Sequence, residues 1–130
     1  MIRNIIVFMF SFVGETEKYI KNFINGEKIK EITEFFMERN IDVSLVVSNE
    51  TLYVYDIIKN KNNLKIFLNR DDKNDYQSYY RAVSSFAKDS IFINLDLLDN
   101  YQEIYDGVIN NNKSSVDING NLFEIIKNNP

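Results

Sequence analysis

The stretch Ile5-Ile6-Val7-Phe8-Met9-Phe10 is the longest uninterrupted apolar run in this chain, and the predicted fold is built outward from it. A short apolar run followed by a turn signal, here Gly14, is typical of a fully buried strand. The run is too short to span a bilayer. The residues behind it, Phe12-Val13-Gly14, match poorly the small residues that precede a signal-peptide cleavage site. We therefore expect a central strand, not a targeting segment.

Length and composition indicate one domain. The chain has 130 residues, of which 45% are hydrophobic and 26% charged, as in ordinary globular proteins. A chain of this length forms one core, so residues 1–130 are expected to make a single globular domain. The sequence contains no His and no Cys, which excludes disulfides, thiolate metal sites and catalysis by an imidazole. The lack of cysteine suits a reducing compartment, and a cytoplasmic location is expected.

The residues after the first strand predict two helices and then three strands. Apolar side chains recur at helical spacing over residues 16–24 and 27–39, with Asn40 as a left-handed cap. Alternating or β-branched residues predict strands over 41–47, 51–58 and 64–68. Short polar connections favour antiparallel neighbours, because a parallel pair needs a crossover of a dozen or more residues. We expect these strands to form an antiparallel meander.

The second half predicts a helix after Asp75, a strand over 91–97, a helix over 99–109 and an exposed loop at 110–115. Asn119-Gly120, between two short strand patterns, favours a type I′ hairpin turn. The fold class is therefore expected to be α+β. It is a single layer of mainly antiparallel sheet, made of the meander, the first and fifth strands and the C-terminal hairpin, with helices packed on it.

Most catalytic motifs are missing. No Walker A loop, GxGxxG, HExxH, CxxC or GxSxG pattern occurs. Tyr55 and Lys59 have the spacing of a short-chain dehydrogenase pair, but no dinucleotide fingerprint precedes them. The carboxylates of Asp71, Asp72 and Asp75 lack the spacing of an EF-hand and suit a charged helix start. We predict no catalytic residue, no cofactor and no metal site, and hence a protein that is not an enzyme.

Two alternatives to this prediction stay open. A small carboxylate-dependent enzyme would need a concave pocket in which acids such as Asp71, Asp96 or Asp99 converge. Asp96 and Asp99 flank the end of a strand, a common place for metal ligands in α/β folds. A protein that binds single-stranded nucleic acid or a nucleotide would use basic side chains among stacking rings. The candidates are Lys59, Lys61, Lys65, Arg70, Lys73 and Arg81, among Tyr53, Tyr55, Tyr76, Tyr79 and Tyr80.

The net charge of −4 is concentrated in the second half, since residues 71–130 hold five basic and ten acidic side chains. General nucleic-acid binding is therefore disfavoured. At about 100° per residue, Asp99, Glu103 and Asp106 fall on one side of the helix over 99–109 and the apolar residues on the other. Asp96 is expected to extend this acidic face.

The acidic face supplies the predicted function. Surfaces of opposite charge associate faster and in a defined orientation, so such a face suits a basic partner protein. We expect a non-enzymatic protein-binding module, an inhibitor of the immunity-protein or antitoxin type that covers a toxin or nuclease through Asp96, Asp99, Glu103 and Asp106. No membrane association is expected. The sequence gives no oligomeric state.

Overall fold

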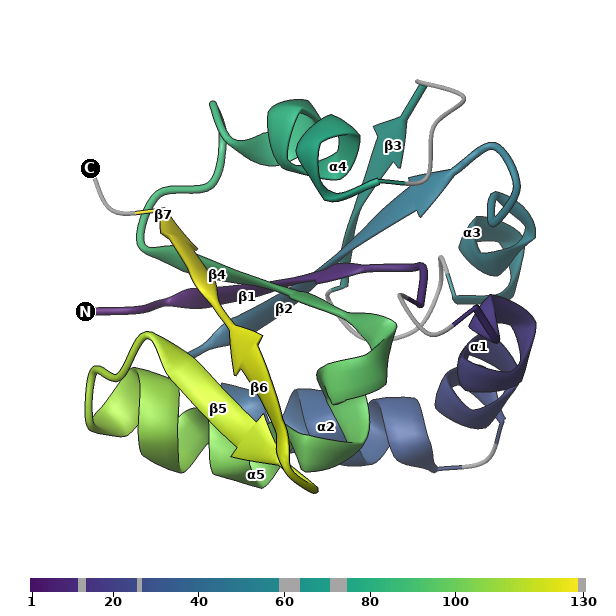
Figure 1. Ribbon diagram of the computed structural model, residues 1–130. Coiled ribbons are helices and arrows are strands. Elements are labelled where there is room, and N and C mark those ends of the chain that lie inside the picture. Colours follow the sequence, from purple (N-terminus) through teal and green to yellow (C-terminus); the bar gives the residue numbers. More distant parts are fainter. Residues whose placement is uncertain (12–13, 26, 59–63, 71–74, 129–130) are drawn as a thin grey trace.

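The computed structural model describes residues 1–11, 14–25, 27–58, 64–70 and 75–128 of the chain. A five-stranded sheet runs through the middle in the order β3-β2-β1-β4-β7 (Figure 1). Its strands are β1 (Asn4–Phe8), β2 (Asp42–Ser48), β3 (Lys65–Asn69), β4 (Ser90–Asn94) and β7 (Ile126–Asn128). The strand β1 lies at the centre, as its apolar run predicts.

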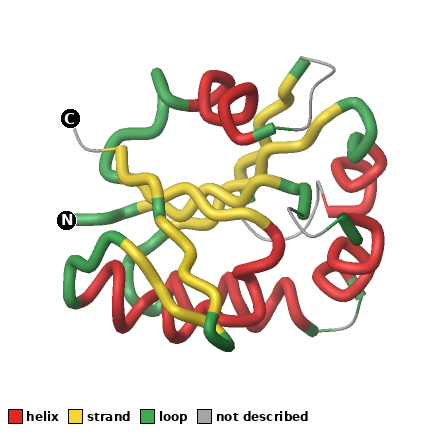
Figure 2. Tube along the Cα trace, viewed as in Figure 1, coloured by secondary structure: helices red, strands yellow, loops and turns green. Residues whose placement is uncertain are grey.

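Helices cover both faces of this sheet, as the tube in Figure 2 shows. On one face lie α1 (Thr16–Ile24), α2 (Lys28–Met37), α3 (Tyr53–Ile58) and α5 (Tyr101–Ile104), whose buried residues join Ile5 and Val7 in the larger core cluster. On the other face α4 (Tyr76–Val83) packs its Tyr79 and Val83 on Ile6 and Phe8. Because alternate residues of β1 point to opposite faces, one short apolar run contributes to both cores.

The mixture of helices and strands agrees with the predicted α+β class, but the expected single layer of mainly antiparallel sheet is wrong. The pairs β1·β2, β1·β4 and β2·β3 are parallel, and only β7 runs antiparallel to its neighbour β4. Burial on both faces is what parallel sheets require. The alternating pattern of residues 41–47 predicts a strand with one buried face. In the structure, six consecutive residues of β2 are buried, so this part of the prediction is wrong.

The meander fails at residues 51–58, which form the helix α3 instead of a strand. The Thr51 hydroxyl accepts a hydrogen bond from the Ser48 N–H at 2.9 Å. The Val54 N–H donates to the Thr51 carbonyl at 3.0 Å. Val54 and Ile58, four residues apart, are fully buried, whereas Tyr53, Tyr55 and Ile57 are more than 40% exposed. Burial of residues at helical spacing therefore outweighs the β-propensity of this segment. The helix forms a crossover connection, and β3 consequently runs parallel to β2.

Several local predictions are confirmed. Asn40 is left-handed as predicted, with φ +60°, although α2 already ends at Met37 with Glu38 as its C-cap. The strands β5 (Ser115–Ile118) and β6 (Asn121–Glu124) form an antiparallel hairpin whose two turn residues, Asn119 and Gly120, have φ +53° and +81°. These values are those of a type I′ turn. The predicted turn at 59–63 and the acids Asp71 and Asp72 lie outside the described residues.

The helix expected over 99–109 is longer and less regular than predicted. Helical structure begins directly after β4 with the 3₁₀ segment η1 (Leu95–Asn100), continues as α5 and ends in the π-helical segment η2 (Tyr105–Asn110). Leu95 and Leu97, expected in the strand, belong to η1. Asp99, expected at the start of the helix over 99–109, therefore lies within the helical turn η1. The residue at the start of α5 is Asn100, whose side chain makes no capping hydrogen bond.

Candidate functional site

The order of the strands identifies one place in the sheet where ligands bind in related architectures. From β1 the chain moves outward to β2 and then β3, and it returns to the other side of β1 at β4. In open α/β sheets, ligands occupy the crevice outside the carboxyl ends of the strands where the order reverses. Here that switch point lies after Phe8 of β1 and Asn94 of β4, which are register partners.

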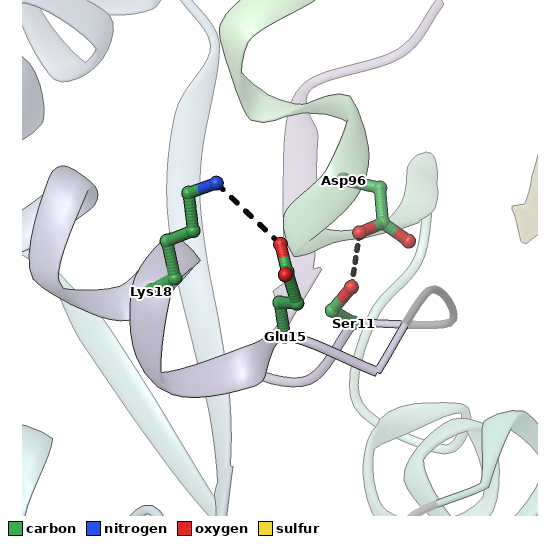
Figure 3. Close-up of polar contacts among 4 residues, drawn as sticks. All are labelled: Ser11, Glu15, Lys18 and Asp96. Atoms are coloured by element: carbon green, nitrogen blue, oxygen red, sulfur yellow. Dashed lines mark hydrogen bonds and ion pairs between the residues drawn. The ribbon is translucent and has the colours of Figure 1, made fainter.

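Three polar side chains meet at the switch point: Ser11, Asn94 and Asp96, which we call the switch-point cluster. The Ser11 hydroxyl donates to one oxygen of the Asp96 carboxylate, and the Asn94 amide donates to the other at 3.0 Å. The backbone holds these residues together, since the Leu95 N–H donates to the Phe10 carbonyl at 3.2 Å. Figure 3 shows the Ser11 hydroxyl turned toward Asp96.

Asn94 has an unusual environment for a polar side chain. It is 1% exposed, and its buried Oδ1 atom has no hydrogen-bond partner among the residues that the structure describes. A buried acceptor left without a partner costs about 1–3 kcal/mol. Such groups are rare in native structures, and each one calls for an explanation. Within the described residues, the switch-point cluster therefore holds one buried acceptor that no protein group satisfies.

The start of α1 borders this cluster. The Ser11 N–H donates to the Thr16 hydroxyl at 3.1 Å, which ties the loop after β1 to the first residue of the helix. Just before that residue, Glu15 forms an ion pair with Lys18 at 3.5 Å, and both side chains are more than half exposed (Figure 3). A hollow of about 630 Å³ extends along α1 from Gly14 to Asn25 and includes both residues. Space for a small ligand thus adjoins the loop.

The cluster is rich in acceptors. The Ser11 hydroxyl and the Asn94 amide both donate to the Asp96 carboxylate, so oxygen atoms of all three side chains gather at this point. Glu15 adds a second carboxylate nearby, and the Lys18 ammonium is already paired with it. Within the described residues, no three acidic side chains come close enough to form a metal-binding group. The arrangement suits a ligand that donates hydrogen bonds.

The structure separates the four carboxylates of the predicted acidic face. Asp96 is turned into the switch-point cluster. Asp99 forms an ion pair with Lys28, at the start of α2, at 3.3 Å. Glu103 and Asp106 are exposed and take no part in the ion pairs of the described residues. Two of the four are thus engaged within the protein, and their role toward a partner stays a prediction.

A different acidic surface arises where α2 packs beside α5. The Tyr101 hydroxyl donates to the Glu31 carboxylate at 2.6 Å, and this hydrogen bond, together with burial, raises the pKa of Tyr101 above its ordinary value. The rings of Phe35 and Tyr101 meet edge to face at 5.0 Å. The groove along this seam, of about 340 Å³, is lined by Glu27, Lys30, Glu31, Glu34, Phe35, Glu38 and Tyr101. Only the tertiary fold brings these glutamates next to the 95–110 segment.

The basic and aromatic residues of the nucleic-acid alternative do not form one face. Tyr79 is fully buried, and the Tyr76 hydroxyl donates to the Phe92 carbonyl at 3.1 Å. Tyr53 and Tyr55 belong to α3, which packs against the other face of the sheet. Lys59, Lys61 and Lys73 lie outside the described residues. Among the described residues, Arg70 and Arg81 share one hollow beside α4, and Tyr76, Tyr80 and Arg81 share another.

The sequence analysis selected Asp96 but missed Ser11, Asn94 and Glu15. A signal was present for two of them, because Asn94 is the last residue of the fully buried strand β4 and Ser11 lies three residues after the end of β1. Carboxyl ends of neighbouring parallel strands lie at the same edge of a sheet, so a parallel prediction would have paired them. Because we expected an antiparallel meander, the sequence analysis did not place these residues at the same edge of the sheet.

The chain thus has an α+β fold whose mostly parallel central sheet carries polar side chains at its switch point. Comparisons with protein-family models, curated proteins and solved structures find no match to this chain. None of the helices in the described ranges has both the length and the apolar character needed to cross a membrane.

Proposed function

We propose that this chain is a small-ligand-binding domain whose site lies at the carboxyl ends of β1 and β4. The ligand is a small polar molecule that presents hydroxyl or amino groups, of the class of sugars, nucleosides and amines. Asp96 accepts hydrogen bonds from it, Ser11 holds the Asp96 carboxylate in place, and Glu15 approaches from the start of α1. This proposal follows the carboxylate-dependent alternative of the sequence analysis more closely than the inhibitor hypothesis.

One observation carries the proposal: the buried Asn94 carbonyl oxygen, which no described residue satisfies, is held beside Asp96 at the switch point of the sheet. An acidic surface that only faces solvent does not need a buried amide. An amide with a purely structural role is expected to have hydrogen-bond partners for both its NH₂ group and its carbonyl oxygen. The site also lies where the topology of an open α/β sheet places ligands.

Thermal unfolding with a ligand panel tests the proposal. Adenosine, uridine, ribose, glucose, spermidine and MgCl₂ are added at constant ionic strength, and a ligand present at 100 times its Kd stabilises the fold by about 2.7 kcal/mol. We expect a saturable rise in Tm with a hydroxylated or amino compound. Asp96→Asn should remove the rise, and Asp99→Asn, which removes a charge three residues along η1, should keep it. A rise that survives Asp96→Asn would contradict the proposal, and a rise with MgCl₂ alone would favour a cation site.

Binding of a basic protein is retained as the second candidate function. The observation that favours it is the groove in which four glutamates, two within α2 and two at its caps, gather beside Tyr101. With Glu103 and Asp106 exposed on the neighbouring segment, this surface is more acidic than the face predicted from one helix alone. Charge complementarity of this kind changes the association rate and its salt dependence more than it changes the affinity.

The two candidates differ in their response to charge reversal. For a basic partner recovered from the native host, Glu34→Lys and Glu103→Lys should slow association, and added salt should slow association of the unmodified chain. Asp96→Asn should leave association unchanged. Equal association rates for all three variants would exclude the acidic surface as the binding site.

A further inference from the structure

Two arginines share a hollow beside α4, and none of its lining residues belongs to the switch-point cluster. The hollow has a volume of about 280 Å³ and lies where the carboxyl end of β3 meets the helix. It is lined by Leu68, Asn69, Arg70, Ser78, Arg81 and Ala82. Asn69 is 2% exposed and Ser78 is 1% exposed, so buried polar residues stand beside the two exposed guanidinium groups.

Neither arginine is neutralised by a carboxylate of the described residues. The ion pairs found among those residues involve Lys18, Lys28 and Arg39. Arg81 donates from Nε to the Gln77 carbonyl at 3.3 Å, which fixes one side of its guanidinium. The carboxylate on the same helix, Asp75, is engaged at the N-terminus of α4, where it accepts from the Ser78 N–H at 2.8 Å. Two like charges in one hollow repel each other, and a bound anion relieves that repulsion.

We propose that this hollow binds the phosphate group of a small phosphorylated metabolite. Guanidinium groups present a planar fork of donors that matches the oxygens of a phosphate. The whole chain carries a net charge of −4, so its overall charge does not attract anions. The attraction for a phosphate group comes from Arg70 and Arg81. A long nucleic-acid backbone would meet repulsion from the rest of the surface, whereas a single phosphate group would not.

Arg81 also borders a second hollow, on the side of α4 that faces β7. This hollow, of about 430 Å³, is lined by Tyr76, Gln77, Tyr80, Arg81 and Ile126, which are mostly aromatic and aliphatic. A phosphate held by Arg81 would place an attached ring next to these side chains, and base–aromatic contacts are favourable. A nucleoside monophosphate should therefore bind more tightly than inorganic phosphate.

Isothermal titration with sodium phosphate and with AMP, at constant ionic strength in chloride, tests the site. We expect saturable binding of both, with higher affinity for AMP. The double substitution Arg70→Met with Arg81→Met should weaken binding by about tenfold or more, as expected for charge-assisted hydrogen bonds. Both side chains are exposed, so the variant is expected to fold, and its circular dichroism and Tm without ligand verify this.

Lys88→Met removes one positive charge from an exposed position elsewhere and should leave the affinity for phosphate unchanged. Asp96→Asn should also leave it unchanged, which separates this site from the proposed switch-point function. Unchanged affinity in the arginine double variant, or no saturable binding by the unmodified chain, would overturn the proposal. Tighter binding of an eight-residue oligothymidylate than of AMP would overturn the assignment to a small metabolite.

Discussion

The hydroxyl of Ser11 donates a hydrogen bond to the carboxylate of Asp96, a residue 85 positions later in the chain. Each residue follows a buried central strand, and the hydrogen bond joins the two strand ends across the switch point. The hydrogen bond joins Asp96, which was selected from the sequence, to Ser11, which was not. The contact turns the half-buried Asp96 carboxylate toward the loop after β1.

The Ser11–Asp96 contact should appear as a coupling energy. Ser11→Ala and Asp96→Asn are each expected to lower the free energy of unfolding by about 1–2 kcal/mol, because a hydrogen bond to a charged group is lost. The double variant should lose about 1 kcal/mol less than the sum of the single losses. Urea unfolding measures all three. Ser11→Ala combined with Asp99→Asn is the control, and its effects should add, since Asp99 pairs with Lys28 instead.

The N-terminal cap of α4 should contribute measurably to stability. Asp75 accepts a hydrogen bond from the Ser78 N–H at 2.8 Å. Asp75→Ala should lower the free energy of unfolding by about 1 kcal/mol, whereas Asp75→Ser keeps a capping oxygen and should recover most of that loss. Chemical denaturation compares the two variants. Equal losses from both would mean that the capping hydrogen bond does not account for the effect.

Alkaline pH should destabilise the protein through Tyr76. Burial raises the pKa of its hydroxyl above the ordinary value of 10.0. The unfolded chain then releases this proton at lower pH than the folded chain, so the stabilisation is complete below about pH 10 and declines as pH rises further. Unfolding by urea from about pH 8 to pH 11 should show a steeper decline for the unmodified chain than for Tyr76→Phe. Tyr55→Phe, at a ring that is 45% exposed, controls for loss of a hydroxyl. Parallel curves for the unmodified chain and Tyr76→Phe would contradict this prediction.

The hairpin turn should depend on glycine at one position only. Gly120 has φ +81°, and a Cβ there would meet nothing within 4 Å, so the cost of Gly120→Ala is conformational. We expect a loss of about 1 kcal/mol. Gly107 lies in the helical segment, where a Cβ would make an ordinary contact with Val116 at 3.7 Å. Gly107→Ala should therefore be neutral or stabilising by up to about 1 kcal/mol. Thermal unfolding of both variants provides the comparison.

The sequence by itself determined the features that depend on neighbouring residues. The apolar run at Ile5–Phe10 was sufficient to predict a buried strand, because no exposed element tolerates it. Asp75 and Asn40 at helix ends, and Asn119-Gly120 in the turn, follow from backbone geometry and nearby hydrogen bonds. These preferences act over a few residues, so they are visible without the rest of the chain.

The tertiary structure alone decided the direction of the strands, the state of residues 51–58 and the neighbours of Asp96. Strand direction depends on which distant segments pack together, and a local pattern carries no information about that choice. Residues 51–58 have strong β-propensity, yet burial of Val54 and Ile58 made them a helix. Asp96 meets Ser11 because β1 and β4 are parallel neighbours. The candidate site exists through pairing across the sheet, which is why its residues are scattered along the sequence.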